Sequence, residues 1–275
     1  MSFKFFSHNG KLKPVEEAVI PLSNVEYSYG FGVYESIRVT NSVVYFLKDH
    51  TERLMESAAV IGLTHLFTAA FVEDAVMKLK EKTGVESYNL KILLIGGRTP
   101  ENASLYILCL NPLFPDKKLY REGVSLVTHE YERMWPHAKT LNMLGSYLAY
   151  RKAKEVGAYD ALLINKKGAI TEGTRTNFFC IQGKTLVGAK EEDILLGVTK
   201  KAVLQVASEN GFGVIEKDIW LSDLGDYDGA FITSTSSKII PVRSIDSLTL
   251  PIPQQLRELM KLFDEFLENS GGILE

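Results

Sequence analysis

A lysine stands at the head of a long apolar run in the middle of the sequence. Lys139 opens "KTLNMLGSYLAY", and none of the eleven residues after it is charged. A lysine that acts as a covalent catalyst must be neutral for part of the time, which desolvation and nearby cations favour, and its amine then forms a Schiff base with an aldehyde. The apolar flank suits that chemistry. Taken alone, the pattern is more typical of a solvated lysine at a helix start.

A carboxylate further along the chain adds to this pattern. Glu172, in "KKGAITEGTRTNFFCI", lies between two apolar stretches, the second of which contains Phe178 and Phe179. Pyridoxal phosphate requires a lysine for its aldehyde and an acidic partner that keeps the ring nitrogen protonated, so that the ring accepts electrons. Lys139 and Glu172 are candidates for these two roles. The alternative for Glu172 is a turn residue ahead of Gly173.

The phosphate of such a cofactor needs backbone N–H groups, hydroxyls or an arginine. The stretch "LLGVTKKAVLQVA" puts Gly197, Val198 and Thr199 at the start of an amphipathic helix, where free N–H groups and the helix dipole favour an anion. Five hydroxyl residues follow an apolar strand at 233–237, among them Ser234, Thr235 and Ser236. Arg53 is a further candidate. The alternatives are an N-cap for Thr199, a polar turn for the hydroxyls and a solvated helix residue for Arg53.

Strands and helices alternate along the first part of the chain. The residues around "TNS" predict a hairpin at 35–46, and periodic apolar residues predict helices at 48–63 and 68–84. Two apolar runs, 88–97 and 103–112, predict buried strands. The charged, proline-containing stretch at 112–123 is the candidate linker.

The second part has its own alternation. A helix is expected at 140–156 and another after Gly197, and strands are expected near 160–165, 169–173, 176–183, 214 and 230–233. The sequence therefore predicts an α+β protein of mixed sheets with helices. We expect a small N-terminal α/β domain at 1–117 and a larger, cofactor-binding C-terminal domain at 118–275.

Composition excludes several classes of function. The chain has 275 residues, 45% of them hydrophobic, a formal net charge of −3 and no long run of like charge, so neither a nucleic-acid partner nor an anionic membrane is expected. Five scattered histidines predict no metal site. Cys109 and Cys180 lie in apolar runs and are expected to be reduced core thiols. With no leader or membrane-spanning pattern, a cytoplasmic protein with a small-molecule substrate is expected.

Six motifs in order and spacing resemble a known family. They are "YGFGVYESIRV", "HTERLMESA", "KTLNMLGSYLA", "EGTRTNFF", "LLGVT" and "TSTSSKIIPV", and they run from about residue 25 to residue 242. The chain resembles the class IV aminotransferases, the fold-type IV pyridoxal 5'-phosphate enzymes. That family includes branched-chain and D-amino acid aminotransferases and aminodeoxychorismate lyase.

The resemblance implies a role for each matching residue. It implies that Lys139 forms the Schiff base and acts as the catalytic base, and that Glu172 contacts the pyridine nitrogen. The other implied cofactor-binding residues are Arg53, Gly197, Val198, Thr199, Ser234, Thr235 and Ser236. The implied substrate-binding residues are Tyr29, Tyr34, Arg38, Thr235 and Ser236. Arg98 and Leu144 depart from the family pattern and are further candidates for the substrate pocket; Arg98 is either a relocated carboxylate binder or a solvated loop residue. The family also implies a D-amino acid aminotransferase-like fold and a homodimer or higher homo-oligomer.

Departures from the family pattern bear on the substrate. D-amino acid aminotransferases and the lyase resemble each other in having an arginine where this chain has Ile95, whereas Tyr29 and Arg38 look like the branched-chain enzymes. Leu144 is closer to the D-amino acid and lyase pattern. We therefore expect ping-pong transamination between an L-branched-chain amino acid and 2-oxoglutarate. The alternatives are a D-amino acid or (R)-amine aminotransferase, a lyase and a non-catalytic relative that binds the cofactor.

Overall fold

The chain packs into two units, each with its own sheet and core. The structure is a computed structural model that describes residues 3–112 and 114–274. The first unit comprises Met1–Leu113, Ala138–Met143 and Ser270–Glu275, and the second comprises Phe114–His137 and Leu144–Asn269. The sequence placed the boundary at 117/118, so two short segments, one of which carries Lys139, belong to the first unit although they lie beyond that boundary.

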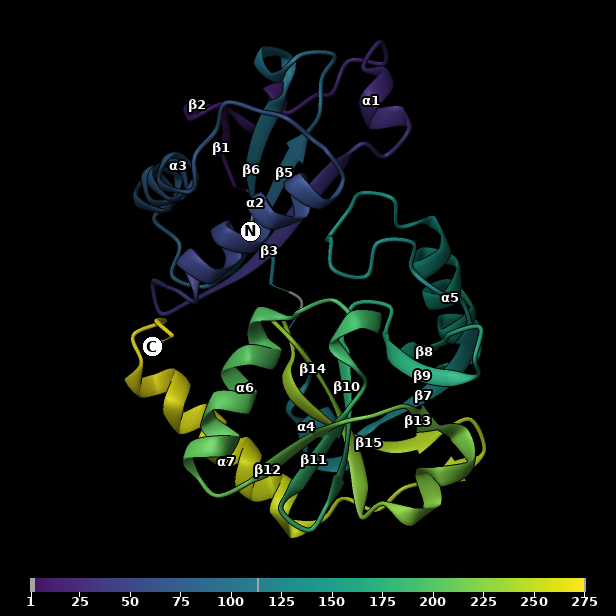
Figure 1. The fold of residues 1–275 in the computed structure, drawn as a ribbon. Coiled ribbons are helices and arrows are strands. Elements are labelled where there is room, and N and C mark those ends of the chain that lie inside the picture. Colours follow the sequence, from purple (N-terminus) through teal and green to yellow (C-terminus); the bar gives the residue numbers. More distant parts are fainter. Residues whose placement is uncertain (1–2, 113, 275) are drawn as a thin grey trace. The chain divides into compact units, whose positions relative to one another are not determined.

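An antiparallel sheet forms the first unit (Figure 1). Its strands within the described residues, in the order β2-β1-β6-β5-β3-β4, are β1 (Phe5–His8), β2 (Lys11–Pro14), β3 (Gly32–Thr40), β4 (Val43–Val44), β5 (Tyr88–Ile95) and β6 (Ser104–Leu110). The hairpin predicted around "TNS" is confirmed, because Asn41 and Ser42 have positive φ angles and join β3 to β4. The strands predicted at 88–97 and 103–112 are β5 and β6.

Two helices cover one face of this sheet, α2 (Leu47–Val60) and α3 (Ala69–Thr83). Both predicted helices are confirmed, and α3 ends at Gly84, whose positive φ suits a helix C-cap. Alternate residues of β3 and β5, such as Ile37, Leu90 and Ile92, pack against the helices. The intervening residues, including Tyr34 and Lys91, therefore lie on the other face. A short helix, α1 (Val25–Ser28), precedes β3.

The second unit is built on a mixed sheet that closes on itself. The pairing path β10-β14-β15-β7-β8-β9 returns to β10 through Glu172 on β9 and Asn177 on β10. The strands in the described part of this unit are β7 (Val124–Glu130), β8 (Asp160–Ile164), β9 (Ala169–Gly173), β10 (Asn177–Gln182), β11 (Thr185–Gly188), β12 (Gly213–Glu216), β13 (Ile219–Trp220), β14 (Gly229–Ser234), β15 (Lys238–Ile245) and β16 (Leu248–Thr249). The predicted strands of this region are all present.

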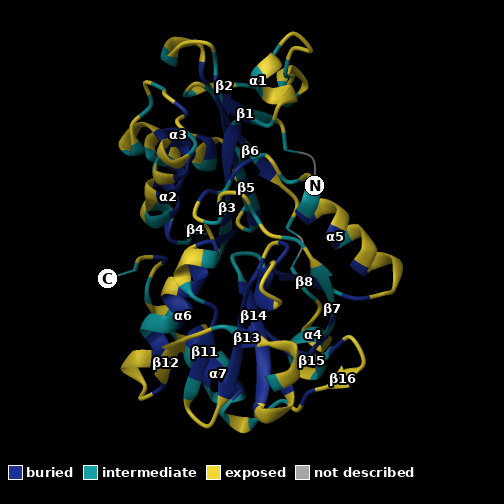
Figure 2. Ribbon diagram, turned by 45° about the vertical axis from the view of Figure 1, so that its right-hand side comes forward, coloured by how far each residue is buried: buried dark blue, intermediate teal, exposed yellow. Residues whose placement is uncertain are grey.

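The helices of the second unit are α4 (Lys117–Glu122), α5 (Leu144–Glu155), α6 (Val198–Glu209) and α7 (Gln254–Asn269). Figure 2 shows β14 and its neighbours buried at the centre of the unit. Two predictions need correction. The stretch predicted as a linker contains α4, and its residue 113 lies outside the described residues. The helix predicted from residue 140 begins only at Leu144, because the backbone before it pairs with β3 instead.

Both cysteines are buried and unpaired, as predicted. Burial raises the pKa of Cys109 to about 11, which makes this thiol unreactive. The α+β class and the mixed sheet are confirmed by the element order. Among the described residues, no helix is long and apolar enough to cross a membrane.

Candidate active site

The segment that contains Lys139 is held by its backbone inside the first unit. The Lys139 N–H donates to Ser57 Oγ on α2 at 3.1 Å, and its carbonyl accepts from the Tyr34 N–H on β3 at 2.9 Å. On the far side of Thr140, which forms a β-bridge with Val33, the Leu141 N–H donates to the Gly32 carbonyl. The lysine side chain therefore extends from a backbone fixed by two elements. A solvated lysine at a helix start, the alternative raised by the sequence, does not describe this position.

A tyrosine ring brings a second lysine to the same place. The Tyr34 ring centroid lies 4.7 Å from Lys139 Nζ and 4.0 Å from Lys91 Nζ, and the Tyr34 hydroxyl donates to Met143 Sδ at 3.7 Å. Burial lowers the pKa of Lys91, and the charge of Lys139 acts in the same direction. Sequence reasoning missed Lys91. The signal was a lysine on the face of "YNLKILLI" opposite the core residues Leu90 and Ile92.

Arg53 belongs to a buried ion pair on the other face of β3. Its Nε and Nη2 donate to the two oxygens of Glu35, both at 2.7 Å, and His50 Nδ1 lies 2.7 Å from Glu35 Oε2. Burial alone would raise the pKa of Glu35, but the Arg53 guanidinium and the hydrogen bonds from Arg53 and His50 hold that pKa well below its usual range. The expectation of a solvated arginine is wrong. Glu35 was not among the predicted site residues.

The motif "HTERLMESA" now has a physical explanation. Residues three and four apart share one side of a helix, so His50, Arg53 and Ser57 of α2 all face the sheet and are buried. His50 and Arg53 hydrogen-bond to the Glu35 carboxylate, and Ser57 accepts a hydrogen bond from the Lys139 N–H. Burial lowers the pKa of His50, which keeps the imidazole neutral at pH 7. Ser57 is therefore a further site residue that the sequence analysis missed.

Glu172 lies in the second unit, within strand β9, where it is 4% exposed. Its Oε1 accepts from Arg133 Nη1 at 2.9 Å, and its Oε2 accepts from the Leu195 N–H at 3.2 Å. The turn interpretation of Glu172 is wrong, because the residue is inside a buried strand. A carboxylate with two charge-assisted or backbone donors is ready to accept a further donor through its remaining lone pairs.

The residues predicted to bind the phosphate lie at and near the start of α6. Gly197 is the N-cap and has no side chain to cap the first turn, while Val198 and Thr199 are buried. Thr199 Oγ1 donates to Thr235 Oγ1 at 3.4 Å, which brings the turn between β14 and β15 to the helix terminus. The N-cap interpretation of Thr199 is wrong, since that residue lies inside the helix. The polar-turn interpretation of 233–237 is correct only for its later residues, because Thr233 is buried within β14, whereas the hydroxyls of Ser234 and Ser237 form a 2.6 Å hydrogen bond across the turn that follows.

The predicted substrate residues are less closely grouped. Tyr34 contacts the Lys139 side chain, whereas Tyr29 is 80% exposed. Arg38 lies near the end of β3 and donates from Nε to Thr40 Oγ1, and Arg98 is exposed after β5. Leu144, the first residue of α5, is 66% exposed. Ser236 lies next to Thr235 in the turn of the second unit.

The comparisons with known proteins agree with one family. A model described as "Amino-transferase class IV" matches residues 32–245. D-alanine aminotransferase from Bacillus licheniformis is 33% identical over 88% of each chain. Branched-chain aminotransferase from Thermoproteus uzoniensis, solved with norvaline, has a TM-score of 0.88 at 27% identity and covers 97% of this chain and 95% of its own.

A second solved structure carries a derivative of the cofactor. A branched-chain amino acid aminotransferase from T.th., complexed with N-(5'-phosphopyridoxyl)-L-glutamate, has a TM-score of 0.89 at 25% identity and covers 99% of this chain and 96% of its own. These similarities confirm the predicted fold type and indicate a transaminase. The chain belongs to the class IV aminotransferases.

Proposed function

We propose that the protein is a pyridoxal 5'-phosphate enzyme that transfers an amino group between an L-branched-chain amino acid and 2-oxoglutarate. The observation that carries the proposal is the placement of Lys139, whose backbone is fixed by β3 and α2 and whose amine lies 4.7 Å from the Tyr34 ring centroid. A covalent lysine needs a defined position relative to the group that it attacks.

The residues present fit the three recognition groups of the cofactor. The uncapped start of α6, together with the Thr199 and Thr235 hydroxyls, is a donor set suited to a phosphate. Glu172 offers a fixed carboxylate to a protonated ring nitrogen, and Lys139 offers an amine to the aldehyde. When bound, pyridoxal phosphate supplies an aldehyde that condenses with amines and a ring that accepts electrons.

Lys139 has two tasks in this proposal. Its Nζ would hold the cofactor at the aldehyde group. When free, the same amine would move a proton between the substrate Cα and the C4' carbon of the cofactor, as one general base and acid. Because the amino acid leaves as its 2-oxo acid before the second substrate enters, the kinetics should be ping-pong.

An apolar surround at residue 95 supports L-branched-chain substrates. Ile95 is fully buried and packs in a cluster with Phe6 and Tyr106, where D-amino acid aminotransferases and the lyase have an arginine. Side chains of leucine, isoleucine and valine differ by single methylene or branching changes, so discrimination among them should be modest, about 1–3 kcal/mol. Lys91 joins Arg38 and Arg98 as a candidate partner for the second carboxylate of 2-oxoglutarate.

A second candidate is a D-amino acid aminotransferase. The observation that favours it is the 33% identity to the Bacillus licheniformis D-alanine enzyme over 88% of the chain. The same lysine can take the Cα proton of either enantiomer, provided that the substrate carboxylate and side chain exchange places. Handedness therefore depends on which cation binds the carboxylate, and not on Lys139.

A substrate panel separates the two candidates. Turnover should be measured with L-leucine, D-leucine and D-alanine as donors, each with 2-oxoglutarate or pyruvate as acceptor. We expect L-leucine with 2-oxoglutarate to be the fastest pair. Faster turnover of D-alanine than of L-leucine would reject the L-branched-chain assignment.

Lys139→Ala should abolish the absorbance of the lysine-bound cofactor and slow turnover by orders of magnitude. Near-normal activity of that variant would reject the proposal.

The phosphate assignment has its own test. Arg53→Ala and Thr199→Ala should raise the dissociation constant of the cofactor more than they slow the half-reaction of the saturated enzyme.

We further propose a cytoplasmic homodimer or higher homo-oligomer. It is supported by exposed apolar residues on one segment of the first unit, Val19, Leu22, Val25, Tyr27 and Tyr29. Light scattering that finds a fully active single chain of 30.7 kDa would reject it.

A further inference from the structure

Glu172 is held by an ion pair that has no direct part in the proposed chemistry. Arg133 follows β7 in the chain, and its Nη1 donates to Glu172 Oε1 at 2.9 Å. The side chains of Arg133 and Glu172 are 14% and 5% exposed, so water screens this pair little. Salt bridges between exposed side chains contribute little, whereas a pair buried to this extent constrains both partners.

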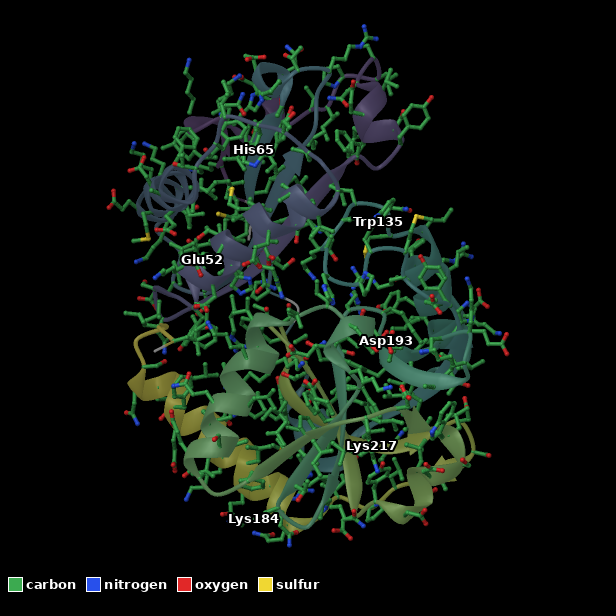
Figure 3. All side chains as sticks on the ribbon, viewed as in Figure 1. Glu52, His65, Trp135, Lys184, Asp193 and Lys217 are labelled. Carbon is green, nitrogen blue, oxygen red and sulfur yellow. The ribbon has the colours of Figure 1, made fainter. Side chains whose placement is uncertain are left out.

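The other carboxylate oxygen is fixed by the backbone that leads into α6. Leu195 donates its N–H to Glu172 Oε2, and its carbonyl accepts from Asn177 Nδ2 at 2.8 Å. Asn177 is also the register partner of Glu172 at the closure of the sheet. Figure 3 labels Trp135 and Asp193, which lie two residues after Arg133 and two before Leu195, in the segments that reach Glu172. Glu172 is therefore held at both oxygens.

We propose that Arg133 is a positioning residue that holds the Glu172 carboxylate in the orientation in which it meets the ring nitrogen of the cofactor. This inference rests on the proposed function and adds a residue to it. A carboxylate with a hydrogen bond at each oxygen is held in one orientation, so its remaining lone pairs point to a fixed place. With Arg133 and the Leu195 N–H bound to Glu172, that orientation is fixed before the cofactor binds.

A test follows from the ring nitrogen itself. Pyridoxal phosphate can be compared with its 1-deaza analogue, which carries a C–H in place of that nitrogen and gives Glu172 nothing to pair with. The full-length protein is freed of cofactor and titrated with each compound, and the preference is the ratio of the two dissociation constants. The readout is binding and not turnover, so it does not depend on activity of the loaded enzyme.

The inference predicts an ordered set of preferences. Arg133→Gln should reduce the preference for pyridoxal phosphate by roughly tenfold, the scale of one charge-assisted hydrogen bond. Arg133→Lys retains the charge without the planar fork and should give an intermediate loss. Arg121→Gln removes an exposed arginine that pairs with Glu122 and should leave the preference unchanged. In a Glu172→Gln background, Arg133→Gln should have no further effect, because Arg133 acts through Glu172.

Each other outcome counts against a defined part of the argument. A folded Arg133→Gln protein with the wild-type preference would overturn the inference, as would an equal effect of Arg133→Gln with and without Glu172. If circular dichroism shows that Arg133→Gln does not fold, Arg133→Lys decides, and an unchanged preference in it overturns the inference. A wild-type protein that binds both compounds equally would reject the role of Glu172 in the proposed function. Failure of wild type to bind either compound would reject the cofactor.

Discussion

The buried carboxylate of Glu35 offers the sharpest test of how the first unit is held together. Glu35 is fully buried, and its two oxygens accept short hydrogen bonds from Arg53 and His50. Glu35→Gln keeps the shape of the side chain but removes the buried negative charge that both pairs with and hydrogen-bonds the Arg53 guanidinium. Breaking one partner of a buried ion pair costs about 3–5 kcal/mol. We expect the variant to lose that much free energy of unfolding.

The measurement is urea unfolding followed by far-UV circular dichroism, with refolding checked on dilution. The matched control is Glu52→Gln, which removes an exposed carboxylate from α2 (Figure 3). Glu52 Oε1 lies 3.8 Å from Lys48 Nζ. Screened pairs of this kind contribute little, so the control should unfold like wild type. The cofactor should also bind more weakly to Glu35→Gln, because Arg53 loses its orientation. Equal stability of Glu35→Gln and Glu52→Gln would show that the pair is not what holds α2 to β3.

Three further predictions concern other parts of the protein. Gly197→Ala should destabilise the fold by about 1–3 kcal/mol and weaken cofactor binding, because an added Cβ would overlap Oδ1 of Asn177, whose Nδ2 is hydrogen-bonded to Leu195. The control Gly225→Ala has open space around its Cβ and should leave thermal unfolding unchanged. Lys91→Met should raise the KM for 2-oxoglutarate more than the KM for leucine, and an equal rise for both would mean that Lys91 does not bind the second carboxylate of 2-oxoglutarate. The pKa of His50 is lowered in the folded protein, so the unfolded chain binds a proton at this residue first as the pH falls. The free energy of unfolding should therefore decline below about pH 6.5, and it should decline less in His50→Asn. Urea unfolding at about pH 7.5 and pH 5.5 measures both.

Sequence reasoning found the residues whose chemistry restricts their type. Lys139 and Glu172 could be proposed because a Schiff base needs an amine and a ring nitrogen needs a carboxylate, and the structure puts both on fixed backbone. Periodicity also predicted α2 and α3, since their apolar residues recur at helical spacing. The start of α5 could not be found in the same way. The residues at 140–142 are uncharged and helix-compatible, but their backbone groups pair with β3, more than a hundred residues earlier in the chain.

The assignment of Lys139 to the first unit has the same origin. Residues 138–143 follow a long stretch of the second unit, and nothing in their composition marks a return to the first. The hydrogen bonds to Ser57, Tyr34 and Gly32 decide where this segment lies. The position of such a segment is set by pairing with strands and helices that are distant in the sequence, so local secondary-structure propensity does not predict it.

Residues that support the candidate site are harder to find from sequence than Lys139 and Glu172. Ser57 accepts a hydrogen bond from the Lys139 N–H, Arg133 donates to the Glu172 carboxylate, and Asn177 donates to the carbonyl of Leu195. Many polar side chains can make such bonds, so these positions lack the chemical restriction that makes Lys139 and Glu172 recognisable. Their effect on geometry is nevertheless direct, because a displacement of about 1 Å at a reacting group can cost a hundredfold in rate. Ser57 illustrates the difference: replacing it with alanine removes the acceptor for the Lys139 N–H without changing the lysine side chain. If Lys139 acts as proposed, this hydrogen bond affects catalysis only through the position of the Lys139 backbone.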